Sequence, residues 1–281
     1  MIKNKKGLAL IVVIMLIVFV AICVLGISTF IVQWLEQLNA DQINAKCLYL
    51  AQAGVQSALY NVRNIYISTY NTLGYYATGL FTVDSGETYR LGGNAADFLM
   101  VYTSDTRAQG TEFLGLYIQN ATNSALPVVS IDRMVVTWTI SGGGGGGHWW
   151  WGSSATLQSI RIGGWDRWTG NLNSPANADF ITNYTLTGTS AISVDRLRFS
   201  SSIQNLSSMS IEFVMTDGSS KTVAVYPPSD TCQFTINSTG KVSGSSIYRT
   251  IRATYDLTPL NFNTDSKIVD IDEINTEITS P

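Results

Sequence analysis

Residues 8–32 read LALIVVIMLIVFVAICVLGISTFIV and carry no charged side chain. A helix of about 20 apolar residues crosses a bilayer, so this stretch is long enough to do so. Lys3, Lys5 and Lys6 come directly before it. Because positive charge stays on the cytoplasmic side of a membrane span, we expect everything after residue 32 to lie outside the cytoplasm. An ordinary secretory signal has a shorter apolar region, followed by a cleavage site of small residues.

The helical pattern continues beyond the apolar stretch. Between residues 33 and 64, apolar side chains recur three or four positions apart, while polar side chains fill the opposite face. The apolar positions are Leu35, Leu38, Ala45, Leu48, Ala51, Val55, Ala58 or Leu59, and Val62. This spacing predicts one uninterrupted helix over residues 8–64, whose second half packs its apolar stripe on a globular domain.

The rest of the chain, residues 65–281, has the composition of an extracytoplasmic β protein. Only 13% of the 281 residues are charged, and there are thirteen tyrosines and seven tryptophans. Residues 128–140, VVSIDRMVVTWTI, are the clearest strand because they are β-branched and alternate. Other strand-like runs follow at intervals of about ten residues, which is typical of an antiparallel β-sandwich. These runs are residues 88–91, 98–103, 113–119, 156–162, 180–187, 192–199, 209–215, 222–226, 232–236, 247–255 and 267–271. We therefore predict an α+β protein with a long N-terminal α-helix and a C-terminal antiparallel β-sandwich head.

Two segments resemble a known family. Lys5-Lys6-Gly7 before Leu8 resembles the class III leader of type IV pilins and type II secretion pseudopilins. Residues 50–59, LAQAGVQSAL, are similar to the alanine-rich segment of PilX-type minor pilins. The resemblance implies that a prepilin peptidase removes residues 1–7 after Gly7 and methylates the new first residue, Leu8. The helix would then anchor the chain in the inner (cytoplasmic) membrane and later pack with other pilin subunits in an extracellular filament.

One departure from the family bears on the kind of subunit. Most members have glutamate as the fifth mature residue, where its charge compensates the terminal amine of a neighbouring subunit, but here that position is Val12. A lone carboxylate in hydrocarbon is costly unless paired, and a subunit at the filament tip has no terminus above it. The resemblance therefore implies a structural minor pilin or pseudopilin, at the tip or initiating the filament. The alternatives are a major subunit and a single-pass membrane-anchored carbohydrate-binding or adhesion module.

Tryptophans form the most unusual run outside the helix. A glycine run at residues 142–147 leads into His148 and then Trp149, Trp150 and Trp151. Neighbouring side chains of an extended backbone face opposite sides, so these three cannot all enter the core. Exposed tryptophan suits sugar stacking, membrane-interface contact or subunit docking, which makes a surface or glycan ligand a candidate partner. Trp165 and Trp168 could join the patch. The alternative is that the tryptophans fold back on the sheet.

Three cysteines in an exported chain cannot all pair within it. Cys23 lies in the apolar stretch, Cys47 on the predicted helix and Cys232 in the β region. Either Cys47 and Cys232 form a disulfide that ties the helix to the head, or both are buried free thiols.

The sequence contains few residues in patterns suited to catalysis or metal binding. His148 is the only histidine, and no C-x-x-C, H-E-x-x-H or phosphate-loop pattern occurs. We predict no enzyme activity, no cofactor and no metal site. Asp270, Asp272 and Glu273 belong to an acidic stretch that we expect to be solvated, with calcium ligation as the alternative. The net charge of −3 gives no reason to expect nucleic-acid binding.

Overall fold

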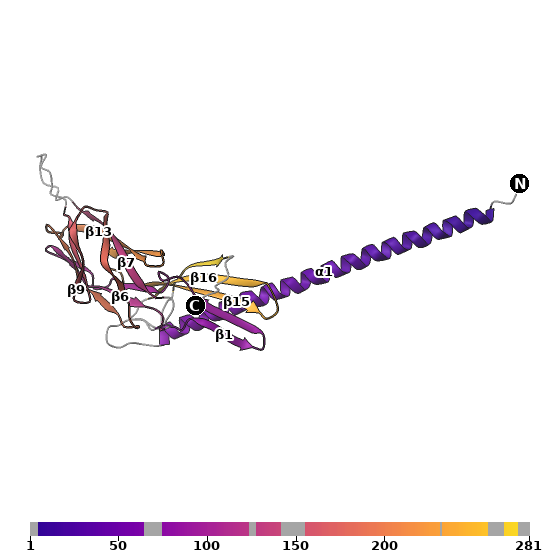
Figure 1. The fold of residues 1–281 in the computed structure, drawn as a ribbon, viewed down its shortest axis with the longest axis horizontal. Helices are drawn as coiled ribbons and strands as arrows, with labels where there is room; N and C mark the ends of the chain where they lie inside the picture. Colours follow the sequence, from indigo (N-terminus) through magenta and orange to yellow (C-terminus); the bar gives the residue numbers. More distant parts are fainter. Residues whose placement is uncertain are drawn as a thin grey trace, which may run out of the picture.

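The computed structural model describes residues 5–64, 75–123, 128–141, 155–230, 232–257 and 267–274. Its first element, α1 (Lys5–Asn64), is a single unbroken helix of 60 residues, which confirms the prediction of one long helix. At about 1.5 Å per residue, α1 is roughly 90 Å long. Figure 1 shows α1 projecting like a stalk from a body of β-strands. In the described part of the chain, α1 is the one helix long and apolar enough to span a membrane.

The two halves of α1 have different surroundings. Between Ile11 and Leu38 the large apolar side chains are 39–69% exposed. From Cys47 onward, one face of the helix is buried against the β body, which confirms that part of the predicted apolar stripe. The buried residues of this face are Cys47, Leu50, Ala51, Val55, Ala58, Leu59 and Val62. Leu35, Leu38 and Ala45, also predicted to belong to the stripe, are exposed because the β body does not reach them.

The described strands form four hydrogen-bonded sheets, and the first of these carries the helix. Its strands are β1 (Gly79–Asp84), β2 (Glu87–Gly92), β15 (Cys232–Val242), β16 (Tyr248–Leu257) and β17 (Lys267–Ile274). They lie side by side in the order β1-β2-β15-β16-β17, with every pair antiparallel. The second half of α1 packs on β15, β16 and β2. The first and last parts of the head therefore meet beneath the helix.

The middle of the chain forms the other three sheets. One has the order β10-β7-β13-β14, built from β7 (Ser130–Ile140), β10 (Ala176–Thr185), β13 (Leu206–Met215) and β14 (Ser220–Tyr226). Another has the order β11-β6-β3, built from β3 (Leu99–Tyr102), β6 (Leu116–Asn120) and β11 (Ile192–Val194). The last has the order β4-β5-β12-β8-β9, built from β4 (Arg107–Gln109), β5 (Glu112–Leu114), β8 (Leu157–Ile162), β9 (Trp165–Leu172) and β12 (Arg196–Phe199). One apolar core runs from the buried face of α1 through all four sheets.

The predicted class, α+β with an antiparallel head, is confirmed, whereas the β-sandwich is not, because the strands divide among four sheets. Two predicted strands are each broken in two. Gly115 separates β5 from β6; its φ is +84°, and a Cβ there would overlap the carbonyl of Asp105. Asp195 separates β11 from β12, which belong to different sheets. The strand expected at residues 128–140 is confirmed as β7.

Candidate assembly helix and head surface

Small residues let α1 approach the first sheet closely. A Cβ added at Gly240 of β15 would overlap the backbone of Cys47 and lie 2.6 Å from the amide of Ala51. A Cβ added at Gly54 of α1 would overlap the hydroxyl of Ser238. Glycine is needed where another backbone approaches this closely. We call this contact the glycine seam, formed by Gly54 and Ser238 with Gly240, Cys47 and Ala51.

Two polar contacts mark the point where the helix enters the head. Lys46 Nζ lies 3.1 Å from Glu87 Oε1 of β2. The thiol of Cys47 donates to the carbonyl of Ile247, at 3.4 Å, next to the start of β16. From this point towards the N-terminus, α1 projects away from the strands (Figure 1).

The predicted processing residues lie at the free end of α1. Gly7 and Leu8 belong to the first turns of the helix, and the side chain of Val12 is exposed further along it. Cleavage after Gly7 is a prediction that comes from the resemblance to pilins.

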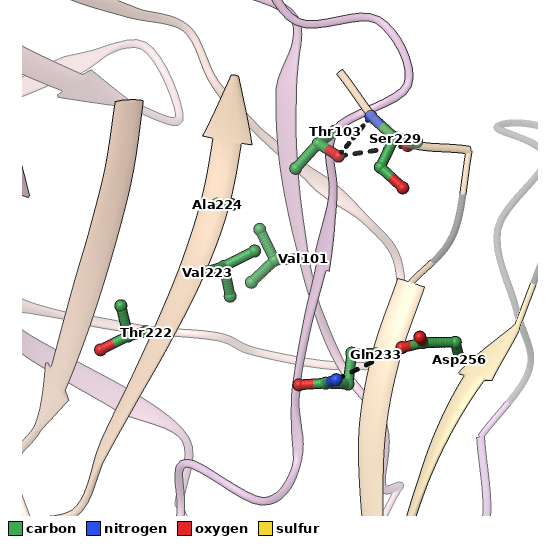
Figure 2. Close-up of a pocket in the computed structure, with 8 residues that line it drawn as sticks. All are labelled: Val101, Thr103, Thr222, Val223, Ala224, Ser229, Gln233 and Asp256. Carbon is green, nitrogen blue, oxygen red and sulfur yellow. Dashed lines mark hydrogen bonds between the residues drawn. The ribbon is translucent and has the colours of Figure 1, made fainter. Parts of the chain in front are cut away.

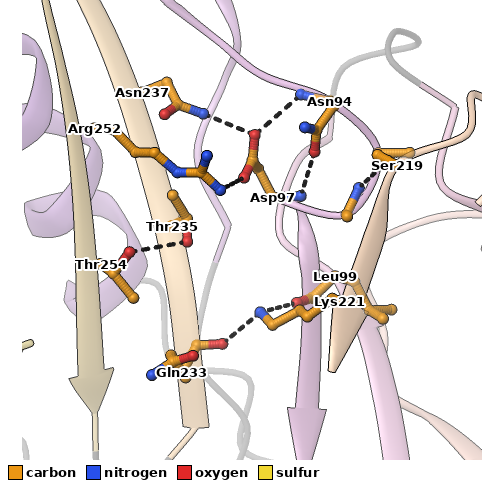
Figure 3. Close-up of polar contacts among 12 residues, drawn as sticks. Asn94, Asp97, Leu99, Ser219, Lys221, Gln233, Thr235, Asn237, Arg252 and Thr254 are labelled. Carbon is orange, nitrogen blue, oxygen red and sulfur yellow. Dashed lines mark hydrogen bonds and ion pairs between the residues drawn. The ribbon is translucent and has the colours of Figure 1, made fainter. Parts of the chain in front are cut away.

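A buried carboxylate ties the first sheet to the loop between β2 and β3. Asp97 accepts hydrogen bonds from Arg252 of β16 at 2.9 Å and from Asn237 of β15 at 2.8 Å (Figure 3). Asp97 also accepts from the backbone amide of Asn94, at 3.1 Å. A carboxylate removed from water needs such partners, and here a cation and two further donors supply them.

The same loop is bound to the turn between β13 and β14. The backbone amide of Ala95 donates to Asp217 at 2.8 Å, and that of Ala96 donates to the hydroxyl of Ser219 at 3.1 Å. Burial alone would raise the pKa of Asp217, but hydrogen bonds from Ala95 and Ser219 outweigh it and hold the pKa below its usual value. The loop thus joins the helix-bearing sheet to the second sheet.

Lys221 of β14 reinforces this junction. Its ammonium donates to the carbonyl of Leu99 in β3 at 2.6 Å and to that of Gln233 in β15 at 2.8 Å (Figure 3). Burial lowers the pKa of Lys221. One side chain therefore connects strands of three different sheets, and the head can hold a fixed orientation on its helix.

A hollow of about 210 Å³ lies beside this junction (Figure 2). Its floor is apolar, with Val101 and Val223, and its polar rim is largely engaged internally. The hydroxyl of Thr103 donates to the carbonyl of Ser229 and accepts from the backbone amide of Ser229. The side-chain amide of Gln233 donates to the carboxylate of Asp256 at 3.3 Å. Because these polar groups already bond one another, we regard the hollow as part of the packing of the junction.

The structure separates the two predicted binding tryptophans of β9. Trp165 is 73% exposed, whereas Trp168 is 9% exposed and packs over Gly170. The ladder between β8 and β9 shifts register between them, since Ile160 pairs with Trp168 and Arg161 pairs with Asp166. The expectation that Trp168 joins an exposed patch is therefore wrong. His148 and Trp149, Trp150 and Trp151 lie outside the described residues.

The strand β10, which contacts β9, carries another exposed apolar side chain. The β8–β9 turn reaches β10 at Gly163, where an added Cβ would lie 3.1 Å from the hydroxyl of Tyr184. The guanidinium of Arg167 stacks over the ring of Tyr184 at 4.6 Å, and burial raises the pKa of this tyrosine. Ile181 of β10 is 84% exposed. Sequence reasoning did not single out Ile181, although Phe180 and Ile181 are adjacent on a strand, so one of them had to face outward.

Of the two alternatives for Cys47 and Cys232, the disulfide does not form in this structure, and both are buried free thiols. Cys47 contacts Gly240, whereas Cys232 begins β15 at the other end of the strand, opposite Leu257. Burial raises the pKa of Cys47, and raises that of Cys232 to about 11. The second alternative, two free thiols, describes the pair.

The acidic stretch lies on a strand, as predicted for residues 267–271, and the side chains of Asp270, Asp272 and Glu273 are exposed, as expected. Residues Lys267–Ile274 form β17 along β16, and Glu273 lies 3.1 Å from Arg249. The described ranges contain no group of three His, Cys, Asp or Glu residues placed to hold a metal ion.

Comparison of the chain with protein-family models, curated proteins and solved structures finds no match. The resemblance to pilins therefore rests on residues 1–59 themselves.

Proposed function

We propose that this chain is a structural, pilin-like subunit. Its leader is removed after Gly7, α1 first anchors it in the cytoplasmic membrane, and α1 later packs with other pilin subunits in a filament outside the cell. The observation that carries the proposal is the uncovered half of α1. Its apolar side chains between Ile11 and Leu38 point in all directions and are 39–69% exposed. A helix that is apolar all round requires lipid or other helices around it.

The way α1 is mounted favours a filament subunit over a simple membrane anchor. A binding module needs only a tether to its membrane helix, and a tether can be flexible. Here the helix runs unbroken from the apolar half into the glycine seam, where Gly240 approaches the helix backbone and Gly54 approaches the side chain of Ser238. The Asp97 and Lys221 contacts then hold the remaining sheets to this mount. A rigid connection of this kind lets packing of the helices fix the position of the heads.

Val12 supports a minor subunit at the tip. A carboxylate at this position would need a partner in the hydrocarbon, and a tip subunit has no neighbour above to provide one. A major subunit of an unusual filament is the runner-up, and abundance in sheared surface filaments separates the two. Packing of the head as a β-sandwich also remains a proposal.

The exposed side chain of Trp165 favours a second candidate function. A single-pass, membrane-anchored module that binds carbohydrate or another surface would use such an apolar, flat side chain. This function requires the chain to keep residues 1–7 and never to enter a filament.

A substitution at the processing site separates these functions. Gly7→Leu should leave the chain at full length in the membrane and remove it from the sheared surface fraction. Thr182→Ala is the control, because this exposed residue of β10 lies outside the proposed assembly helix. The control should be processed like the unaltered chain. Equal amounts of the Gly7→Leu chain and the control in the sheared fraction would contradict the proposal.

A further inference from the structure

The fold sorts four potential modification sites into two classes. The sequence N-x-S/T is the acceptor motif for N-linked glycans on exported proteins. The motif occurs at Asn120, Asn183, Asn205 and Asn237. A transferase that acts on a folded chain needs an accessible asparagine amide nitrogen. The four asparagine side chains differ in their accessibility.

Two of the asparagines are buried and already engaged. Asn237 lies inside β15, and its Nδ2 donates to Asp97 at 2.8 Å, so the atom that would bond to sugar is committed to the buried carboxylate. Asn120 ends β6, and its Oδ1 accepts the backbone amide of Thr122 at 3.0 Å. A glycan on either residue would have to displace part of the core.

Asn183 is exposed in a bulge of β10. Asp179 pairs with Arg133 and Tyr184 pairs with Ile131, so β10 has four residues between these pairs where β7 has one. Residues 180–183 therefore have no partner in this ladder; Phe180 is buried, whereas residues 181–183 are exposed. β10 is also the first strand of its sheet in the order β10-β7-β13-β14. Asn183 therefore lies on the outer strand of its sheet, and its side chain is exposed.

Asn205 is exposed in a turn. The backbone amide of Leu206 donates to the carbonyl of Ile203 at 2.9 Å, which closes the turn just before β13. The carbonyl of Asn205 accepts the amide of Ser141, so the backbone is held while the side chain stays outside. An exposed turn is the setting in which such motifs are most accessible.

We propose that Asn183 and Asn205 are acceptors for N-linked glycans, and that Asn120 and Asn237 are not. In the reaction, Nδ2 attacks the anomeric carbon of a saccharide carried on a lipid phosphate. The new bond joins nitrogen to that carbon, the carbon–oxygen bond to the phosphate breaks, and the lipid phosphate leaves with the electron pair while the amide loses one proton. The proposal rests on the proposed export of the head.

A glycan on Asn183 would also have a local effect. Ile181 and Asn183 are two positions apart in the irregular part of β10, and both are exposed. Sugar attached to Asn183 would therefore lie near the 84% exposed side chain of Ile181.

The test uses the full chain recovered from the cells that make it. After protease digestion, mass spectrometry should show the peptides containing Asn183 and Asn205 to be heavier by whole sugar residues. Thr185→Val should abolish the addition at Asn183, because it removes the motif. Thr185→Ser keeps both the motif and a hydroxyl to bond Ser130, 3.0 Å away, and should retain the addition. Ser207→Ala and Ser207→Thr form the same matched pair for Asn205.

Two results would overturn the assignment: either of these two peptides unmodified, or sugar on Asn120 or Asn237. Digestion of intact cells with a protease that does not cross membranes separates the two proposals. An external head without sugar refutes the glycan sites alone, whereas a protected, cytoplasmic head refutes the proposed function as well.

Discussion

Gly240→Ala tests whether the glycine seam holds the helix on the head. At an open position in a strand, alanine is ordinarily better than glycine by about 0.5–1 kcal/mol. At Gly240 the added methyl group meets the backbone of Cys47 and Ala51, and lies 2.8 Å from Cβ of Leu50. Because two of these neighbours are helix backbone atoms, they cannot rotate away. The helix must lift from β15, and the sign of the substitution reverses.

The size of the effect follows from the contact. Overpacking a filled core costs about 1–3 kcal/mol, and a clash with backbone belongs near the upper end. A loss of about 3 kcal/mol corresponds to roughly a 100-fold increase in the unfolding equilibrium constant. For a chain of this size, each kcal/mol moves Tm by about 2–4 °C, so Tm should fall by about 6–12 °C.

The assay is thermal unfolding of the full chain in detergent, followed by near-UV circular dichroism of the head. Gly26→Ala is the matched control, since the same substitution there meets nothing within 4 Å. The control should keep or raise Tm because alanine favours a helix. A Gly240→Ala chain that melts with the control would refute the glycine seam as a close backbone contact.

Three further predictions address other parts of the head. Because the pKa of Asp217 is lowered in the folded chain, its contribution to stability is complete above the unfolded pKa of about 4 and is lost as pH falls through the folded value. Tm measured from pH 2 to 7 should therefore drop more steeply in acid for the unaltered chain than for Asp217→Asn. Parallel curves for the two chains would contradict this. The hydroxyl of Ser238 is buried without a hydrogen-bond partner among the described residues; Ser238→Ala should raise stability by about 1 kcal/mol in urea titrations, and a lower midpoint would show that the hydroxyl is satisfied. Trp165→Ser should leave Tm unchanged and weaken attachment of cells to surfaces, whereas Trp168→Ser should lower stability by about 3 kcal/mol; unchanged attachment would argue against an adhesive role for Trp165.

The helix and most strands follow from local patterns. The apolar run of residues 8–32 and the three-and-four spacing after it predict one helix, which α1 confirms. Alternating β-branched residues predict β7 almost to its ends. Such elements can be predicted because residues close together along the chain determine them.

Other features depend on contacts between distant segments, which local patterns do not contain. The break at Gly115 is imposed by the carbonyl of Asp105, and the burial of Trp168 depends on the side of β9 that faces the core. The order β1-β2-β15-β16-β17 joins the beginning of the head to its end. That order also keeps Cys47 and Cys232 apart, although a disulfide between them was a reasonable expectation from their count.

The Asp97 junction was equally invisible in the sequence. Its partners Asn237 and Arg252 are 140 and 155 residues away along the chain. Nothing in the spacing of these residue types distinguishes them from surface polar groups. Only the sheet order brings them to one buried carboxylate.

The most direct test of the central claim is the intact mass of the chain from membranes and from sheared surface filaments, with and without the prepilin peptidase. The account predicts a chain that begins at Leu8 and carries one methyl group in the filament fraction, and a chain that still begins at Met1 when the peptidase is absent. A chain that begins at Met1 in both fractions, whether or not the peptidase is present, would contradict the account and favour the anchored binding module.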